Sequence, residues 1–320
     1  MQRFCLRGQT WSVPLVVACV WIGAQQRVQA QPQAVEKNVI PFTEVADRQH
    51  QITADLVQAG DSSRRTRAEG IAQLPLAQLD PAHHRSVQVI LDNLSLFRRL
   101  PTVSFAADRR TYDYFLQHPD VAVSIWRAME ISQVQLTQSG PVTYQTDTRD
   151  GTVGTVEVLL RTPESVLILC HGQLQGPGMP RPIQARALMH LQPKTVSATH
   201  IQHHCDLFVS FPSQTVEALA KVVSPMSFRI ADKNFEEISL FVSLMSNAMR
   251  RQPGWMEQIS VRLEGVPPER GHELRTVTAN VYVDAERQRL KESGQPVTLE
   301  AMMPPVATNP VTPTSGTLQR

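Results

Sequence analysis

The sequence predicts an α+β fold, in which a curved antiparallel sheet of six to seven strands grips a long C-terminal helix. Three observations lead to this prediction. The 320 residues are 42% apolar and 19% charged, a composition that suits a globular core. Short β-rich segments separated by turn residues run from 131 to 211. A helical stripe of apolar residues then follows between 227 and 252.

The chain before the sheet is predicted to be largely helical. Apolar residues recur at three- and four-residue steps from Val87 to Phe97, which is typical of an amphipathic helix. This helix is expected to end at Leu100, because the residue before a proline disfavours the helical conformation. Three further elements are expected, namely a strand over 102–106 and helices over 109–117 and 119–129.

Six β-rich runs form the predicted sheet. The connections between them are short and rich in glycine, proline and aspartate. A parallel neighbour would need a crossover of about a dozen residues or more, so we predict an antiparallel meander. The predicted strands cover 131–138, 142–148, 152–161, 165–174, 181–192 and 199–211.

Alternation assigns the two faces of the last two strands, because successive side chains of a strand point to opposite sides. The core-facing positions are predicted to be Ile183, Ala185, Ala187, Met189, Leu191, Ile201, His203, Cys205, Leu207, Val209 and Phe211. The opposite face carries Arg186, His190, Gln192, His200, His204 and Asp206. The strand that starts at Ser165 is apolar on both sides. We therefore expect either a buried position or a cover from residues 31–100.

The long helix is predicted over about 227–252 and is stopped by Pro253 and Gly254. At 1.5 Å per residue it would reach roughly 36 Å. Seven strands spaced at about 4.8 Å span roughly 30 Å, so one helix can cross the whole sheet. Its apolar stripe consists of Phe235, Ile238, Phe241, Val242, Met245, Ala248 and Met249. A short helix over 215–223 is expected before it, and a possible extra strand within 266–284, around 276–284, after it.

This order of one strand, two short helices, six antiparallel strands and a long helix resembles the START-like helix-grip (SRPBCC-type) superfamily. The resemblance covers roughly residues 100–254 and concerns element order. It depends on the strand at 102–106, the helices around Tyr112 and Trp126, the six strands and the helix that carries Phe235 and Met245. The helix at 215–223 and the strand around 276–284 depart from the pattern. The resemblance implies an apolar cavity between sheet and helix, in which members mostly bind lipids, sterols or other apolar molecules and some catalyse reactions.

Flexible and aromatic side chains on the predicted inner surface are the expected ligand contacts. Methionine can adapt to different ligands, and aromatic rings supply contact area. The predicted ligand-binding residues are Trp126, Tyr144, Met189, His203, Phe235, Phe241, Met245 and Met249. Arg186, His203 and Tyr144 would be the polar contacts. The alternative is that these side chains fill the core completely and leave no cavity.

The segment from His200 to Asp206 contains three histidines, a cysteine and an aspartate, which are transition-metal ligands. Alternation directs His203 and Cys205 inward and the others outward, so we predict no metal site.

Cys170 and Cys205 lie on strands about 9.6 Å apart, beyond the separation of about 7 Å that a disulfide permits between Cα atoms. We therefore predict two free, mostly buried thiols.

The first thirty residues have the pattern of an export signal. Arg3 and Arg7 precede an apolar run from Trp11 to Ala24, and a small-x-small junction ends at Ala30. Fourteen apolar residues are fewer than the roughly 20 that a membrane-spanning helix needs. We expect cleavage near Ala30 and an extracytoplasmic protein, in the periplasm or secreted. The alternative is a lipoprotein anchored through Cys19.

The two ends differ from the predicted domain over 81–265. Residues 31–80 are polar and glutamine-rich, which predicts a linker or loose helical arm. Residues 285–320 pass into a tail of proline, threonine, serine and glycine, which is expected to be disordered.

The net charge of +2 becomes −1 without residues 1–30, which contain three arginines and no acid. With no cluster of cations, a nucleic-acid partner is not expected.

The sequence contains no GxSxG or phosphate-loop motif, so no catalytic residue and no cofactor are assigned. We predict an exported, non-enzymatic protein that binds an apolar ligand, such as a lipid, between the sheet and the long helix. Two alternatives stay open. One is an envelope scaffold with a filled core whose two arms contact envelope protein partners. The other is an enzyme that uses the same cavity, with His203 as acid or base.

Overall fold

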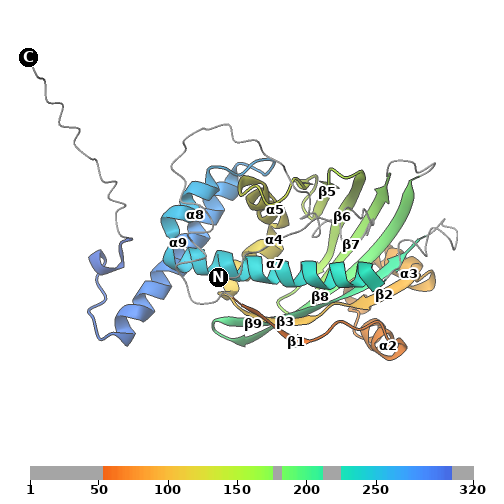
Figure 1. Ribbon diagram of the computed structural model, residues 1–320, viewed down its shortest axis with the longest axis horizontal. Helices are drawn as coiled ribbons and strands as arrows, with labels where there is room; N and C mark the ends of the chain where they lie inside the picture. Colours follow the sequence, from red (N-terminus) through yellow and green to blue (C-terminus); the bar gives the residue numbers. More distant parts are fainter. Residues whose placement is uncertain (1–52, 176–181, 212–224, 305–320) are drawn as a thin grey trace, which may run out of the picture.

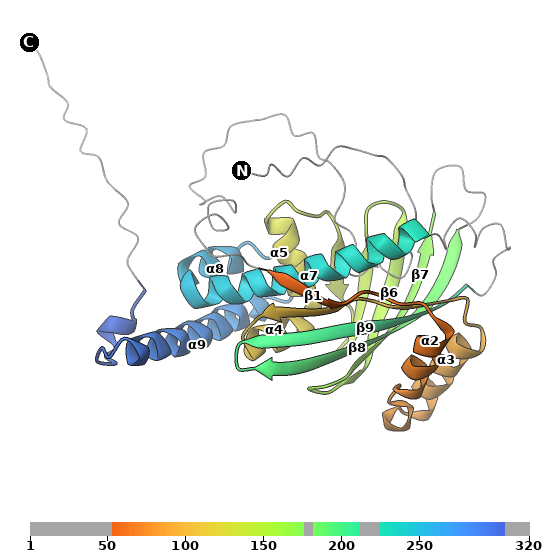
Figure 2. The same cartoon turned by 60° about the horizontal axis from the view of Figure 1, so that its bottom comes forward.

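A computed structural model describes residues 53–175, 182–211 and 225–304. Within these ranges, nine strands form one antiparallel sheet in the order β1-β3-β9-β8-β7-β6-β5-β4, and β2 pairs with β9 beside β3. The sheet is strongly curved, and helix α7 (Pro225–Arg251) lies across its concave side (Figures 1 and 2). The predicted α+β class with a gripped helix is confirmed, with a few more strands than expected.

The predicted meander agrees closely with the structure. The six strands are β4 (Gln135–Gln138), β5 (Thr143–Asp147), β6 (Thr152–Arg161), β7 (Val166–Leu174), β8 (Ile183–Ser197) and β9 (His200–Ser210). Each pairs antiparallel with the next. Strand β3 (Thr102–Ala106) and helices α4 (Arg109–Gln117) and α5 (Pro119–Ala128) also lie where the sequence places them. Short turns therefore determine most of this architecture.

Two predictions for the N-terminal region are corrected. The segment expected to be a linker or loose arm contains strand β1 (Ala54–Gln58), which pairs with β3, and helix α2 (Arg64–Ala72). The helix expected to reach Phe97 is α3 (Pro81–Asp92), and Phe97 belongs to strand β2 (Leu96–Arg99). Pairing with β9 ends the helix early, because the Ser95 amide already donates to the Val209 carbonyl at 2.8 Å.

The region after α7 is helical. Helix α8 (Pro253–Ser260) precedes α9 (Glu269–Glu292), and a short 3-10 turn, η3 (Glu300–Met302), follows. The possible strand within 266–284 is therefore a helix, since Leu274, Thr278 and Val281 recur at helical spacing and are all buried. The tail over 285–320 was expected to be disordered, but its first residues belong to α9 and a later part forms η3. The predicted helix at 215–223, the export signal and residues 305–320 lie outside the described residues.

The convex face of the sheet has its own core, formed with the N-terminal helices. Its buried members are Leu74, Val87, Ile90, Phe97, Leu167, Leu169, Leu188 and Phe208. The short turn η2 (Leu76–Gln78) joins α2 to α3, and both helices lie on this side (Figure 2). The expectation that residues 31–100 cover the strand after Ser165 is confirmed. This cover explains why β7 is apolar on both faces.

A buried ion pair lies under α2. Arg99 donates to both carboxylate oxygens of Asp206, from Nε and from Nη2, at 2.7 Å each, and Asp206 is fully buried. A Cβ atom at Gly70 of α2 would lie 2.6 Å from Asp206 Oδ2, so glycine permits this close approach. His190, directly opposite Asp206 in the sheet, is also buried. The face of β8 and β9 that the sequence places opposite the core is thus partly internal.

Candidate functional site

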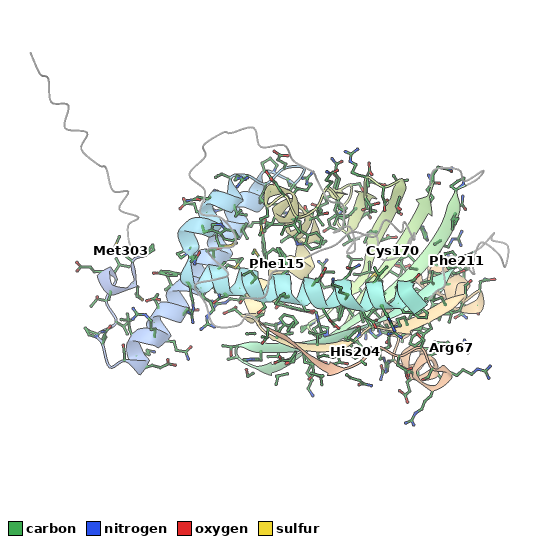
Figure 3. All side chains as sticks on the ribbon, in the orientation of Figure 1. Arg67, Phe115, Cys170, His204, Phe211 and Met303 are labelled. Atoms are coloured by element: carbon green, nitrogen blue, oxygen red, sulfur yellow. The ribbon has the colours of Figure 1, made fainter. Side chains whose placement is uncertain are left out.

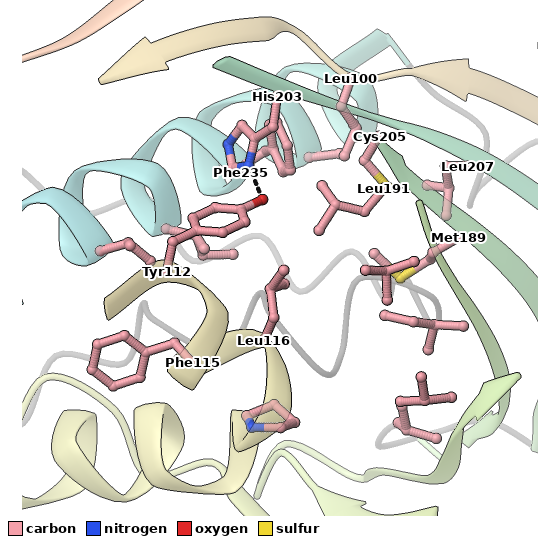
Figure 4. Close-up of a pocket in the computed structure, with 18 residues that line it drawn as sticks. Leu100, Tyr112, Phe115, Leu116, Met189, Leu191, His203, Cys205, Leu207 and Phe235 are labelled. Atoms are coloured by element: carbon pink, nitrogen blue, oxygen red, sulfur yellow. Dashed lines mark hydrogen bonds between the residues drawn. The ribbon is translucent and has the colours of Figure 1, made fainter. Parts of the chain in front are cut away.

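A cavity lies between the N-terminal half of α7, the concave side of the sheet and helix α4 (Figure 4). It leaves about 80 Å³ in which the centre of a water-sized molecule can move. One buried water occupies roughly 10–15 Å³, so the cavity has room for more than one water-sized molecule. The lining residues are Leu100, Tyr112, Phe115, Leu116, Pro119, Val156, Val158, Val166, Ile168, Met189, Leu191, His203, Cys205, Leu207, Ala231, Phe235, Ile238 and Val242.

Regular spacing within each element builds the cavity wall. Helix α7 contributes Ala231, Phe235, Ile238 and Val242, which follow one another at three- and four-residue steps. The strands contribute alternate residues, such as the pair Val156 and Val158 on β6. Figure 3 shows Phe115 of α4 among the side chains that lie between the helices and the sheet. The wall is therefore made by rigid elements.

The cavity lining is almost entirely apolar. Among the described residues, eighteen side chains line the cavity and none of them carries a charge at neutral pH; of these, only Tyr112, His203 and Cys205 contribute polar atoms. Burying a charged group without a partner costs several kcal/mol, whereas burying apolar surface is favourable. This arrangement suits a guest that is itself largely apolar.

His203 lies at the centre of a hydrogen-bonded group on the wall. Its Nδ1 atom is 2.9 Å from the Tyr112 hydroxyl, and its Nε2 atom is 2.7 Å from Ser239 Oγ. The Ser239 hydroxyl donates to the Phe235 carbonyl at 2.8 Å. Because Ser239 uses its one proton there, it accepts from His203 Nε2–H, and Nδ1 accepts from the Tyr112 hydroxyl. One tautomer thus satisfies every group.

Aromatic rings surround this imidazole and keep it neutral. The ring centroids of Phe105 and Phe235 lie 4.9 Å and 4.6 Å from that of His203. Burial disfavours the charged imidazolium and lowers the pKa of His203 to about 3. Burial likewise raises the pKa of the Tyr112 hydroxyl well above its usual value. His203 is therefore an uncharged part of the wall at neutral pH.

The two cysteines of the described chain are free and buried, as predicted. Cys205 lines the cavity, and its sulfur lies 3.8 Å from the Asp206 carbonyl. Burial raises the pKa of Cys170 to about 12 and that of Cys205 well above its ordinary value. Both are consequently protonated, and neither has the thiolate character that a nucleophilic cysteine needs.

Three of the eight predicted ligand-binding residues line the cavity, namely Met189, His203 and Phe235. The other five, Trp126, Tyr144, Phe241, Met245 and Met249, are buried outside the lining. Trp126 packs edge-on against Phe241 at 5.5 Å, and the Tyr144 hydroxyl donates to the Gln117 carbonyl. Phe241, Met245 and Met249 lie on the C-terminal half of α7, which packs against α4, α8 and α9 and away from the cavity.

Arg186, expected as a polar contact, is exposed and lies on strand β8 beside Ala187, which faces the core. Tyr112 and Ser239, the two partners of His203, are not among the ligand-binding residues predicted from the sequence. A signal for Tyr112 was available, because Tyr112, Phe115 and Leu116 share one helical face by their spacing. Ser239 offered none, since a serine within an apolar stripe usually satisfies its own helix backbone.

The described part of the chain contains no group of three or more histidine, cysteine, aspartate and glutamate side chains that could hold a metal ion. His203 and His190 face opposite sides of the sheet, and the imidazole of His190 bonds to Ser165 Oγ at 2.9 Å. Over the same residues, none of the helices combines the length and the apolar composition needed to cross a bilayer.

Comparison with known proteins finds similarity only to solved structures, since no protein-family model and no curated protein matches the chain. A conserved protein from Geobacillus kaustophilus is 12% identical with a TM-score of 0.33, over 45% of this chain and 89% of that one. Ara h 8.0201 is 7% identical with a TM-score of 0.28, over 45% of this chain and 98% of that one. The fold class therefore rests on the sheet order and the position of α7.

Proposed function

We propose that this protein is a START-like helix-grip protein that binds a small apolar molecule in the cavity beneath α7. The observation that supports this proposal most is the composition of the wall: among the described residues, eighteen side chains from the sheet, the β2–β3 connection and three helices border apolar space, and none of these side chains is charged. Desolvation of the guest supplies the affinity. Ligands of this kind include lipid chains and ring compounds. The part of the ligand that enters the cavity can be no larger than the cavity.

A binding role agrees better with the wall than acid–base catalysis does. A general acid or base must exchange a proton with its substrate and works best with a pKa near the working pH. Both ring nitrogens of His203 already have partners, and its pKa is about 3. His203 is therefore assigned a structural place in the wall.

The test is a binding measurement on a protein whose cavity has been filled. Ala231 lies on α7 and lines the cavity, so Ala231→Leu places three additional carbon atoms in the apolar space. We expect wild type to retain an apolar molecule from a lipid extract in native mass spectrometry. We expect Ala231→Leu to bind that molecule at least about tenfold more weakly.

The matched control is Leu240→Ala, a substitution on the same helix at a side chain that is 38% exposed and outside the lining. It should bind like wild type. Wild type that is folded, free of ligand and indifferent to the extract would contradict the proposal. It would favour the scaffold alternative instead.

A further inference from the structure

Among the described lining side chains, the phenolic oxygen of Tyr112 can accept a further hydrogen bond. Its proton is used by His203 Nδ1, but a hydroxyl oxygen keeps lone pairs that can accept a second hydrogen bond. Tyr112 lines the cavity, and its hydroxyl end lies beside the space between Leu116 and Leu191 (Figure 4). A guest can therefore place a donor group at this atom.

Free donors are missing from the described lining. The Nε2–H of His203 points to Ser239, whose own proton goes to the Phe235 carbonyl. The Cys205 thiol is directed at the Asp206 carbonyl. Neither lysine nor arginine belongs to the described lining. A carboxylate or phosphate in the cavity would lose its hydration and find no compensating donor.

We infer that the cavity selects neutral apolar molecules that carry one hydrogen-bond donor, such as an alcohol, and rejects anions such as fatty-acid carboxylates. The donor group bonds to Tyr112 Oη, and the apolar remainder contacts Leu191, Leu207 and Ile238. This inference rests on the proposed function, because it specifies the ligand class of the same cavity.

The experiment compares toluene, benzyl alcohol and benzoate at pH 7, three single-ring compounds that differ in one substituent. Binding to the full chain is measured by calorimetry for wild type, Tyr112→Phe and Tyr114→Phe. Tyr114 is the matched control, because it is a buried tyrosine on the same helix whose hydroxyl donates to the Arg270 carbonyl, away from the lining.

In wild type, benzoate should bind at least about 100-fold more weakly than benzyl alcohol. Tyr112→Phe should weaken benzyl alcohol about three- to tenfold and leave toluene unchanged, because only the alcohol loses a hydrogen bond. Tyr114→Phe should leave the ratio of the two affinities as in wild type.

Two outcomes overturn the inference alone. One is benzoate binding as tightly as benzyl alcohol, a comparison that needs only wild type if Tyr112→Phe does not fold. The other is an equal effect of Tyr112→Phe on toluene and the alcohol. If none of the three compounds binds to folded wild type, the proposed function fails as well, and this result is distinguishable from both.

Discussion

Replacing Arg99 by leucine is expected to lower the free energy of unfolding by about 3–5 kcal/mol, which is the usual effect of removing one partner from a buried ion pair. Asp206 is fully buried beneath α2, and Arg99 holds both of its oxygens. Without the guanidinium, the carboxylate stays in the core with its main partner missing. Denaturant unfolding of wild type and Arg99→Leu measures the difference.

The double variant Arg99→Leu/Asp206→Leu separates the pair's net contribution from the effect of an orphaned charge. Apolar replacement of a whole buried pair is often nearly neutral, so the double variant should recover most of the loss. Arg65→Leu is the control. Arg65 pairs with Glu69 on the exposed side of α2, so this substitution should change the free energy of unfolding little. If Arg99→Leu were as stable as wild type, the ion pair would not stabilise the packing of α2 on the sheet.

Acidification is expected to destabilise the protein through its buried histidines. Burial lowers the pKa of His203 to about 3 and that of His190 to about 4, whereas an unfolded histidine titrates near 6.5. Their contribution to stability is therefore complete above pH 6.5 and is lost as the pH falls toward the folded pKa. Between pH 7 and 4.5 each should reduce the free energy of unfolding by about 2 kcal/mol.

The measurement is the difference in unfolding free energy between pH 7 and pH 4.5. His203→Gln should show a pH dependence smaller than wild type by about 2 kcal/mol, whatever its stability at pH 7. The exposed His84 on α3 provides the control substitution, His84→Gln. If His203→Gln does not fold, His190→Gln replaces it. The same pH dependence in wild type and the buried-histidine variant would contradict the assignment of a neutral, enclosed imidazole.

The sequence determines the sheet more clearly than the segments around it. Short turns allow only antiparallel pairing, and alternation correctly places Met189, His203 and Cys205 on the concave side. Strand β2 was hidden, because Phe97 continues the helical spacing of α3 and its pairing with Phe208 of β9 is a contact across 111 residues. Helix α9 resembled a strand because its middle is rich in valine and threonine, whose β propensity tertiary packing overrides.

The sequence predicts which side chains face the concave side of the sheet. It does not predict which of them border open space. The stripe on α7 contains both Phe235, which borders the cavity, and Met245, which does not. The two positions have the same periodicity, and only the packing of α8 and α9 around the C-terminal half separates them. The contact between Tyr112, His203 and Ser239 likewise joins three elements, and spacing within one element carries no information about it.

The most direct test of an open apolar cavity under the N-terminal half of α7 is a crystal structure of the full chain under xenon pressure. Xenon enters apolar cavities and is excluded from filled cores. We expect density for xenon, or for a copurified apolar molecule, in contact with Met189, Leu207 and Ile238, and none around Met245 and Ala248. Side chains packed against one another at the first position, with no density between them, would contradict the account.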